Sequence, residues 1–448
     1  MKRLFVSLVM VVVAVTSCQK EYVSNDAPKQ NQSVELPSSN TRSYDEALAI
    51  AEDALKLLES DETRSTTKRV IKRNEGQTVM RPVTRGGEEN EEPIMYVFNN
   101  EDNQGFTIIA ANRAQQPLIA VTELGNYTYG EPTGVEPFDL LMDDVVSTLS
   151  ITPPEIIIPD TPITPTPGYY VDTVYYRTSA VDKMLTTKWG QSGIYGAYCP
   201  NGLSGCGNTA AVQIMAYHRA PSSLLMTYDN SNALVFLDWR GMLRHFNGNG
   251  SSCACGCNYV QIGKVMREVG HKSFTNYRDD DPSTSTDERG SGTAEVDTHN
   301  TLVGLGYGHA QHTANINLAE NIDVIIDNLD NKLPLYMSGY RNPSGGHAWV
   351  IDGYNRLEYK INIYVSNPDY NPSIIYNPQP EYIVGETRVA DIITLHINWG
   401  WDGTCDGWFN YGNFATNDAE SYDNTGINNG TNRNYLRNFH LIYNIKTN

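Results

Sequence analysis

The stretch that decides the fold is residues 205–218, GCGNTAAVQIMAYH. From Thr209 to Met215 it is almost entirely apolar, as in a helix that is buried on every side. Cys206 stands at the start of this helix between two glycines, which leave room for a tight turn and for a close approach of substrate. Because the positive end of a helix dipole favours a thiolate, the pattern is typical of a cysteine nucleophile. The alternative is a small buried side chain, the commoner fate of a single cysteine.

Two further motifs supply an oxyanion donor and a proton acceptor for such a thiol. Fifteen residues before Cys206, the sequence KWGQ ends at Gln191, whose side-chain amide can donate a hydrogen bond to an oxyanion. In GGHAWVIDGY, His347 stands at the head of an apolar run, 141 residues after Cys206. Papain-like enzymes separate the thiol and the imidazole by about 130 to 150 residues. The spacing therefore favours His347 as the base that takes the proton of Cys206.

A fourth motif, NWGW, places the amide of Asn398 beside the indoles of Trp399 and Trp401. An amide can orient an imidazolium by a hydrogen bond, and aromatic rings can shield it from water. These three residues are therefore candidate supports for the histidine.

The four motifs resemble, in sequence and in order, those of the streptopain family of cysteine proteases, peptidase family C10. They are KWGQ at 188–191, GC with its helix at 205–218, GGH at 345–347 and NWGW at 398–401. Residues 95–123, which contain YVF and GFTII, resemble the inhibitory propeptide of the same family, so the resemblance spans about 43–440. Four motifs in one order are far more specific than any one of them.

The resemblance implies an α+β, papain-like fold with two lobes, preceded by a small α+β prodomain. A helical lobe would carry Cys206, and a sheet lobe would carry His347 and Asn398. The implied reaction is hydrolysis of polypeptides, with Cys206 as nucleophile, His347 as general base and acid, and Gln191 as oxyanion donor. Neither a cofactor nor a metal is part of this chemistry. Whether Asn398 or one of the neighbouring indoles orients the histidine stays open at this point.

Two further residues, Ser291 and Gly346, are implied by the resemblance to contact substrate. Ser291 lies in the sequence GSGT, for which a flexible surface loop is the alternative. The chain departs from the family pattern at Asp402, where glycine is common. We expect that difference to change the pocket and to leave the catalytic chemistry intact.

Composition divides the chain into five segments. A capping box at Ser43 followed by apolar residues at helical spacing predicts a helix, and apolar runs at 94–98 and 106–110 flank a polar turn, as in a hairpin. The proline-rich stretch that follows predicts an extended linker that proteases can reach. The predicted segments are a lipoprotein signal peptide (1–17), a flexible tether (18–42), an inhibitory prodomain (43–150), the linker (151–168) and the catalytic domain (169–448). The alternative for the third segment is an independent binding or spacer domain.

A basic start, an apolar run at 4–15 and two small residues precede Cys18. The run is too short to span a bilayer and is typical of a secretory signal. The sequence VTSC resembles a bacterial lipobox, in which the cysteine becomes the lipidated first residue of the mature protein; the alternative is an ordinary signal peptide with an incidental Cys18. We therefore expect a cell-envelope protein that is anchored by this lipid alone to a bacterial membrane, the outer membrane above all, or to the cell surface. Processing would be able to release it.

The charge of the chain limits its partners. A formal net charge of -19 over 448 residues repels nucleic acid and anionic lipid surfaces, so the expected partners are polypeptide substrates and the chain's own prodomain.

The run CACGC, with Cys253, Cys255 and Cys257, is unusual for the family. We favour disulfides, one of them to Cys199 or Cys405, over a zinc site, because zinc sites usually leave two residues between neighbouring thiolates.

Two other functions are compatible with the sequence. One is an inactive protease fold on the cell surface that binds peptide or glycan without turnover. The other is a transglutaminase-like acyltransferase, which shares the cysteine and histidine but which the WGQ and NWGW motifs disfavour.

Overall fold

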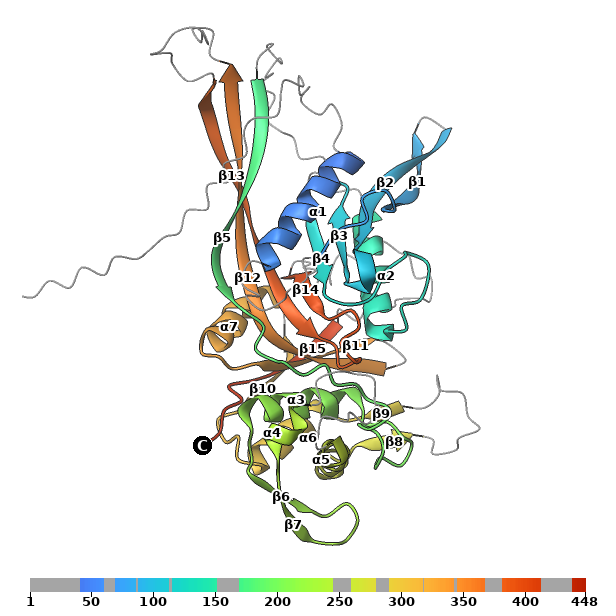
Figure 1. Ribbon diagram of the computed structural model, residues 1–448, viewed down its shortest axis with the longest axis vertical. Coiled ribbons are helices and arrows are strands. Elements are labelled where there is room, and N and C mark those ends of the chain that lie inside the picture. Colours follow the sequence, from blue (N-terminus) through green and yellow to red (C-terminus); the bar gives the residue numbers. More distant parts are fainter. Residues whose placement is uncertain are drawn as a thin grey trace, which may run out of the picture.

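A single antiparallel sheet of eleven strands runs through the molecule (Figure 1). The computed structural model describes residues 41–59, 69–85, 88–112, 115–150, 169–244, 259–278, 290–316, 318–341, 345–366, 381–411 and 437–448. In spatial order the strands are β1 (Gln77–Arg85), β2 (Glu88–Asn99), β3 (Phe106–Ala110), β4 (Leu118–Thr122), β14 (Gly407–Asn410), β13 (Glu381–Asn398), β12 (Gly345–Ser366), β11 (Leu335–Arg341), β15 (Arg437–Tyr443) and β10 (Gln311–Ile316). The eleventh strand, β5 (Tyr169–Val181), pairs with β12 off this path.

The first four strands and two helices form the N-terminal region, within residues 41–150. The helices are α1 (Tyr44–Glu59) and α2 (Glu136–Ser150), and a short 3-10 turn, η1 (Glu101–Asn103), lies between β2 and β3. The predicted capping box is present, because Ser43 and Glu46 exchange two hydrogen bonds of 3.1 and 3.3 Å between backbone N–H and side-chain oxygen. The predicted hairpin is also confirmed, as β2 paired with β3.

Strand β4 joins the N-terminal region to the rest of the sheet. It pairs with β14 through Thr122↔Gly407, Val121↔Trp408 and Ala120↔Phe409. The N-terminal region therefore extends the sheet of the following part of the chain instead of packing beside it as a separate layer.

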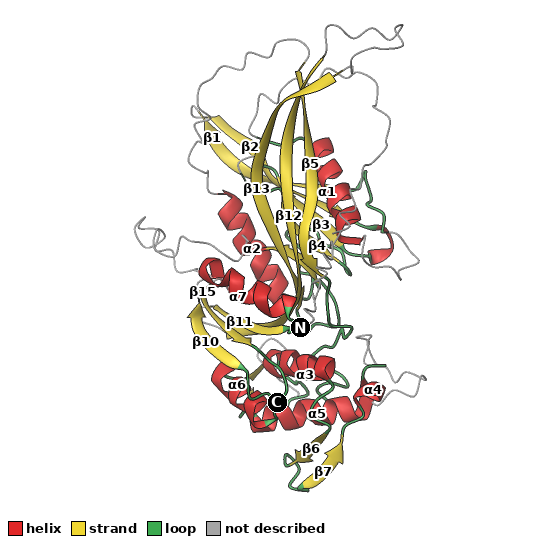
Figure 2. Ribbon diagram, turned by 90° about the vertical axis from the view of Figure 1, so that its left-hand side faces the viewer, coloured by secondary structure: helices red, strands yellow, loops and turns green. Residues whose placement is uncertain are grey.

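Most of the other helices gather at one end of the sheet and form a helical lobe (Figure 2). They are α3 (Cys206–His218), α4 (Trp239–Met242), α5 (Tyr259–Lys272) and α6 (Glu295–Gly304), and α7 (Leu318–Asp330) packs against β11, β12 and β15. Every residue of α3 from Gly207 to Ala216 is buried, as its apolar sequence predicts.

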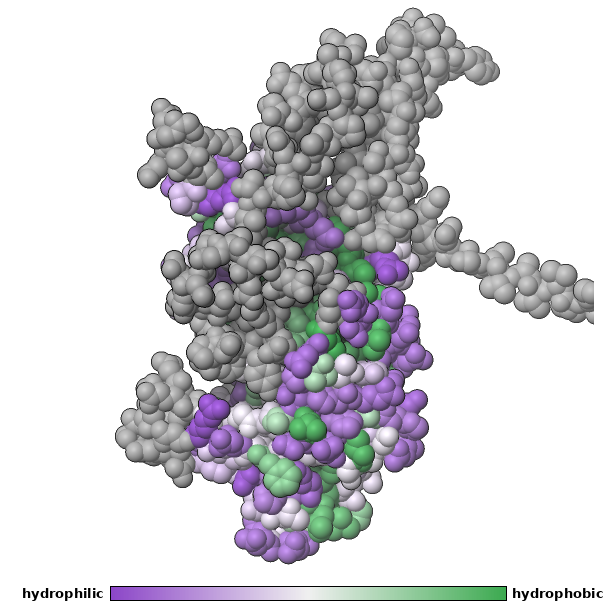
Figure 3. Space-filling view, turned by 180° about the vertical axis from the view of Figure 1, so that it is seen from behind, coloured by the Kyte–Doolittle hydropathy of each residue, from purple (hydrophilic) through white to green (hydrophobic). Residues whose placement is uncertain are grey.

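Two small hairpins belong to the helical lobe. One consists of β6 (Ser223–Met226) and β7 (Ala233–Phe236), the other of β8 (Asn276–Arg278) and β9 (Gly290–Gly292). The first projects from the end of the lobe and exposes Leu225, Leu234 and Phe236, and apolar surface is visible at that end of the molecule in Figure 3.

Two large apolar cores support the two parts of the molecule. The shared core combines N-terminal residues such as Phe106 and Phe138 with residues of the later strands, among them Leu395 and Trp399. The helical core packs α3, α5 and α6 against the face of β12 that carries Val350. The α+β fold class with a helical lobe and a sheet lobe is thus confirmed.

Several predicted segments lie outside the described residues. They are the signal peptide, the tether up to residue 40 and the linker 151–168, so the predicted domain boundaries stay predictions. Within the described ranges, none of the helices has the length and apolar composition needed to cross a membrane.

Candidate active site

Cys206 is the first residue of α3, and the residue before it must be glycine. Gly205 has a φ of 88°, and a Cβ on it would lie 2.6 Å from the carbonyl oxygen of Ser291. Thr209 continues the helix by donating its N–H to the carbonyl oxygen of Gly205 at 3.0 Å. The turn therefore delivers the thiol to the N-terminal end of a buried helix, where backbone N–H groups are free to meet an anion.

The thiol of Cys206 faces the beginning of strand β12. Burial raises the pKa of this thiol above its ordinary value, although the backbone N–H groups of Ala348 and Gly207 act against that increase. Ala348 directly follows His347, so the structure brings the predicted nucleophile and the predicted base to the same place in the fold.

His347 is 6% exposed and lies among three indoles, with ring centroids 6.2 to 6.4 Å from those of Trp349, Trp399 and Trp401. Its Nε2 donates a hydrogen bond to the carbonyl oxygen of Trp399 at 2.8 Å. Because a carbonyl can only accept, Nε2 carries a proton and Nδ1 is the nitrogen left to exchange one. Burial lowers the pKa of His347 to about 4, and the bond to Trp399 offsets only part of this effect. Desolvation therefore disfavours the charged forms of both the imidazole and the thiol in the full-length chain.

Asn398 supports the site through its neighbours and makes no bond to the imidazole. Its Oδ1 accepts from Gln213 Nε2 at 3.0 Å and from the N–H of Gly400 at 3.1 Å. Its Nδ2 donates to the carbonyl oxygen of Thr187 at 2.9 Å. The amide thus ties the end of β13 to α3 and fixes the turn that follows. The sequence left open whether Asn398 or a neighbouring indole orients His347. In the structure the main-chain carbonyl of Trp399 orients it.

Gln191 and Ser291 both lie against the loop that leads into Cys206. The carbonyl oxygen of Gln191 accepts from the N–H of Ser204 at 2.9 Å, two residues before the thiol. The hydroxyl of Ser291 donates to the carbonyl oxygen of Leu203 at 2.9 Å. The loop is therefore held from two sides by predicted site residues.

Gly346 is placed on the other side of the site. It lies in β12 next to His347, where it pairs with Tyr340, and it is exposed.

Two polar residues of the site escaped the sequence analysis. Gln213, fully buried in α3, accepts the N–H of Trp189 at 3.2 Å besides its bond to Asn398. Asp406, 2% exposed, accepts the N–H of Trp399 at 2.8 Å, and burial raises its pKa to about 7. A single polar residue inside an apolar helix was a signal for Gln213, whereas Asp406 stands in no recognisable motif.

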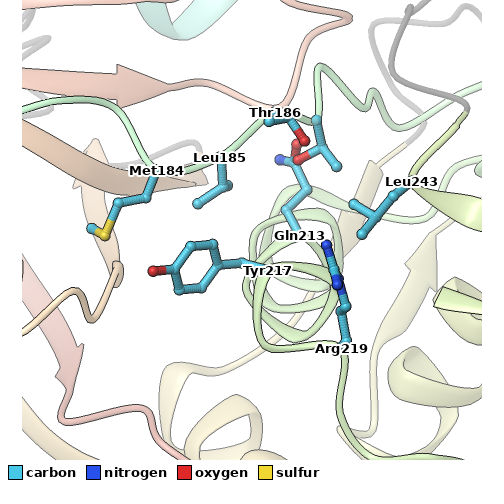
Figure 4. A pocket seen from close by; sticks show the side chains of 8 residues that line it. Met184, Leu185, Thr186, Gln213, Tyr217, Arg219 and Leu243 are labelled. Atoms are coloured by element: carbon cyan, nitrogen blue, oxygen red, sulfur yellow. The ribbon is translucent and has the colours of Figure 1, made fainter. Parts of the chain in front are cut away.

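A pocket lies along α3 away from the thiol (Figure 4). It is lined by Met184, Leu185, Thr186, Thr187, Gln213, Tyr217, Arg219 and Leu243. Neither Cys206 nor His347 lines it, so it is not the site of the predicted chemistry.

The predictions about disulfides and about metal binding have outcomes only for the described residues. Cys199 and Cys405 are buried free thiols, so the expected disulfide to one of them is wrong. Cys253, Cys255 and Cys257, like Cys18, lie outside the described residues. Among the residues that the structure places, no group of three or more His, Cys, Asp or Glu side chains is arranged to hold a metal ion.

Sequence similarity relates the chain to two protein families. Residues 189–409 match the Peptidase C10 family, and residues 22–145 match the Spi protease inhibitor family. Streptopain of Streptococcus pyogenes is 23% identical over 355 residues, which cover 70% of this chain and 73% of streptopain. Streptopain of the serotype M1 organism aligns to the same extent. A solved fragment of prointerpain A from Prevotella intermedia is 19% identical with a TM-score of 0.48 and covers 83% of this chain and 100% of that fragment.

Proposed function

We propose that this chain is a cell-envelope enzyme whose activity depends on Cys206 and His347 and is released by proteolysis. The chain is a streptopain-like cysteine-type endopeptidase of the Peptidase C10 family, and its N-terminal region is similar to a protease inhibitor. The observation that carries this proposal is the meeting of two elements. The N-terminus of α3 presents Cys206 to the segment of β12 that begins with His347, and the carbonyl of Trp399 fixes the far side of that imidazole.

The proposed reaction is acyl transfer through the thiol. His347 Nδ1 takes the proton of Cys206, and the sulfur attacks the carbonyl carbon of the scissile peptide bond. The backbone N–H at the start of α3 and the side-chain amide of Gln191 stabilise the oxyanion. His347 then gives its proton to the leaving amine, the C–N bond breaks and a thioester remains. Water activated by His347 hydrolyses the thioester and restores the thiol.

Latency follows from the state of the pair in the full-length chain. Nucleophilic attack needs the thiolate, yet desolvation raises the pKa of the Cys206 thiol and lowers that of His347, so the charged pair is disfavoured there. Strand β4 adds to β14 a few residues beyond Trp399, so the N-terminal region packs directly behind the support of the histidine. We propose that cleavage between about 130 and 187 allows this region to leave and that the enzyme without it forms the thiolate–imidazolium pair.

The proposed location rests on the sequence around Cys18. A lipidated Cys18 would hold the precursor at the envelope, with the body of the protein outside the cytoplasm. Replacing it in Cys18→Ser should move the protein from the membrane fraction to the soluble fraction of the envelope, measured by fractionation and mass spectrometry of the mature N-terminus. An unchanged distribution would contradict lipid anchoring.

Hydrolysis of casein under reducing conditions tests the enzyme proposal. The processed wild type should cut casein, Cys206→Ala should lose at least about 1000-fold in rate, and Cys199→Ala, which removes a different free thiol, should keep the activity. Equal activity of wild type and Cys206→Ala, or no turnover by either, would contradict the proposal and favour a binding protein.

A further inference from the structure

A cluster of charged side chains lies where the N-terminal region meets the catalytic sheet, with its acidic groups and a histidine buried and its two lysines partly exposed. Glu123, the first residue after β4, lies at its centre with a side chain that is 9% exposed. Its Oε1 lies 2.5 Å from Lys183 Nζ and 3.2 Å from His396 Nε2. Its Oε2 lies 3.4 Å from Lys188 Nζ. One carboxylate of the N-terminal region thus meets three nitrogen groups of the catalytic domain.

His396 is charged in this arrangement. Its Nδ1 lies 2.6 Å from Asp352 Oδ1, while its Nε2 faces Glu123. Because a carboxylate only accepts hydrogen bonds, both ring nitrogens carry protons. Burial alone would lower the pKa of His396, but Asp352 and Glu123 raise it to about 9.

Lys183, Lys188 and His396 would each lose a carboxylate partner without Glu123. Asp352 and Asp406 would remain beside His396. Because His396 is buried, the loss of a partner for its charge is costly, so the emptied arrangement favours another carboxylate. Burial raises the pKa of Glu123, but His396 and the two lysines outweigh burial and hold it well below its ordinary value, as expected for a carboxylate that is fully compensated.

The backbone fixes how Glu123 enters the cluster. Strand β4 ends at Thr122, which pairs with Gly407, and the N–H of Glu123 then donates to the carbonyl oxygen of Asp406 at 2.9 Å. The next bond runs from the N–H of Cys405 to the carbonyl oxygen of Leu124 at 3.2 Å. A strand that adds to β14 therefore places its next side chain over the cations.

We propose that Lys183, Lys188 and His396 form a carboxylate socket on the catalytic domain, and that Glu123 in this socket holds the prodomain on the enzyme after the chain has been cut. The partner that fits the socket is a polypeptide whose strand extends the sheet at β14 and whose next residue is acidic. This inference rests on the proposed activation by cleavage.

The socket also borders the support of the catalytic histidine. Asp406 accepts the N–H of Trp399, and the carbonyl oxygen of Trp399 accepts from His347. Glu123 also bonds to Asp406 through its backbone N–H, so Asp406 links an occupant of the socket to Trp399, which orients His347.

The test uses the full chain in the Cys206→Ala background, with a site for a sequence-specific protease placed in residues 151–168. After the cut, analytical ultracentrifugation gives the dissociation constant of the two fragments. Glu123→Gln keeps the shape of the side chain and removes its charge, so the dissociation constant should rise about 30-fold or more. The matched control is Glu131→Gln, at an exposed glutamate of the same region, which should leave the constant unchanged.

Variants on the catalytic side keep the test decisive if Glu123→Gln does not fold. Lys183→Met should weaken the complex in the same direction, and Lys188→Met should do so less, because its distance to Glu123 is longer. A wild-type complex that holds together while all three variants bind equally well overturns the socket and leaves the proposed function standing. A wild-type complex that separates at micromolar concentration overturns the docking of the prodomain itself.

Discussion

Cys206, the proposed nucleophile, and His347, the proposed base, rest on two different cores. In the described residues, the helical core under Cys206 contains side chains from Leu185 to Ile445 and none from the N-terminal region. The shared core behind His347 combines the same sheet with residues from Val79 to Leu149. The half of the site that carries the thiol is therefore complete without the prodomain, whereas the half that carries the imidazole is not.

This difference indicates where latency acts. Removing the N-terminal region takes partners away from the shared core and from the cluster around Glu123, and both border Trp399, which orients His347. The helical core loses nothing. We therefore expect activation to change the surroundings of the histidine and to leave the helix of the nucleophile as it is.

The largest expected effect on stability comes from truncating a prodomain side chain in the shared core. Phe138 is fully buried and contacts Phe106, Tyr127 and Phe409, with ring centroids 5.2 to 6.3 Å apart. Phe138→Ala should lower the free energy of unfolding of the precursor by about 3 to 5 kcal/mol, measured by urea denaturation. An enzyme released by a cut within residues 151–168 no longer contains residue 138, so it should be as stable as the processed wild type.

The matched control for that prediction lies in the helical core. Met215→Ala removes another fully buried side chain and should destabilise both precursor and processed enzyme by about 2 to 5 kcal/mol. If Met215→Ala affected only the precursor, the helical core would also depend on the prodomain and the comparison would fail.

The pH dependence of stability should also differ between precursor and processed enzyme. The pKa of His396 is raised from 6.5 to about 9 in the full-length chain, so its contribution is complete below pH 6.5 and is lost as the pH rises through 9. Relative to His396→Gln, the wild-type precursor should lose about 3 kcal/mol of unfolding free energy between pH 6.5 and 9.5. The charged groups that face His396 are Glu123, Asp352, Asp406, Lys183 and Lys188.

The same measurement on the processed enzyme, which lacks Glu123, isolates the effect of Glu123 on the pH dependence. Its unfolding free energy should fall less steeply over the same pH range, since Glu123 then no longer raises the pKa of His396. Equal slopes in the two forms, measured by urea denaturation at pH 6.5, 8 and 9.5, would show that Glu123 does not compensate the histidine.

The smallest expected effect concerns Asp402, on the turn after Trp401. Its φ of 56° is a conformation that glycine adopts more easily, and burial raises its pKa to about 6. A folded-state pKa above the ordinary value means that stability is lost as the pH rises through 6. Asp402→Gly should therefore stabilise the processed enzyme by up to about 1 kcal/mol at pH 8, and by less at pH 4.5. A variant that is less stable than wild type at pH 8 would contradict this explanation.

Local sequence patterns were enough to predict much of the molecule. The apolar run after Cys206 predicted a buried helix, the capping box at Ser43 predicted the start of α1, and the GGH motif led to His347. Each of these depends on neighbours within a few residues, where helical and strand periodicity decide the outcome.

The contacts between distant segments were beyond such patterns. Glu123 and His396 are 273 residues apart, and their contact exists only because β4 pairs with β14 in one register. The sequence also does not show that a main-chain carbonyl orients His347, since backbone groups are the same in every residue. Asn398 stood in a suggestive motif, yet its amide is used by Gln213, Thr187 and Gly400.

Alkylation tests whether the N-terminal region keeps Cys206 and His347 uncharged and whether its departure allows the thiolate to form. The rate of reaction of Cys206 with iodoacetamide should be measured from pH 4.5 to 9 in uncut protein and in cut protein freed of the N-terminal fragment, with the modified peptide identified by mass spectrometry. In the uncut chain the reaction should be slow and should increase only toward alkaline pH, because burial raises the pKa of the thiol. In the cut protein it should already be fast near pH 5.5, and His347→Ala should abolish this fast reaction. The same pH profile in both forms would contradict the account.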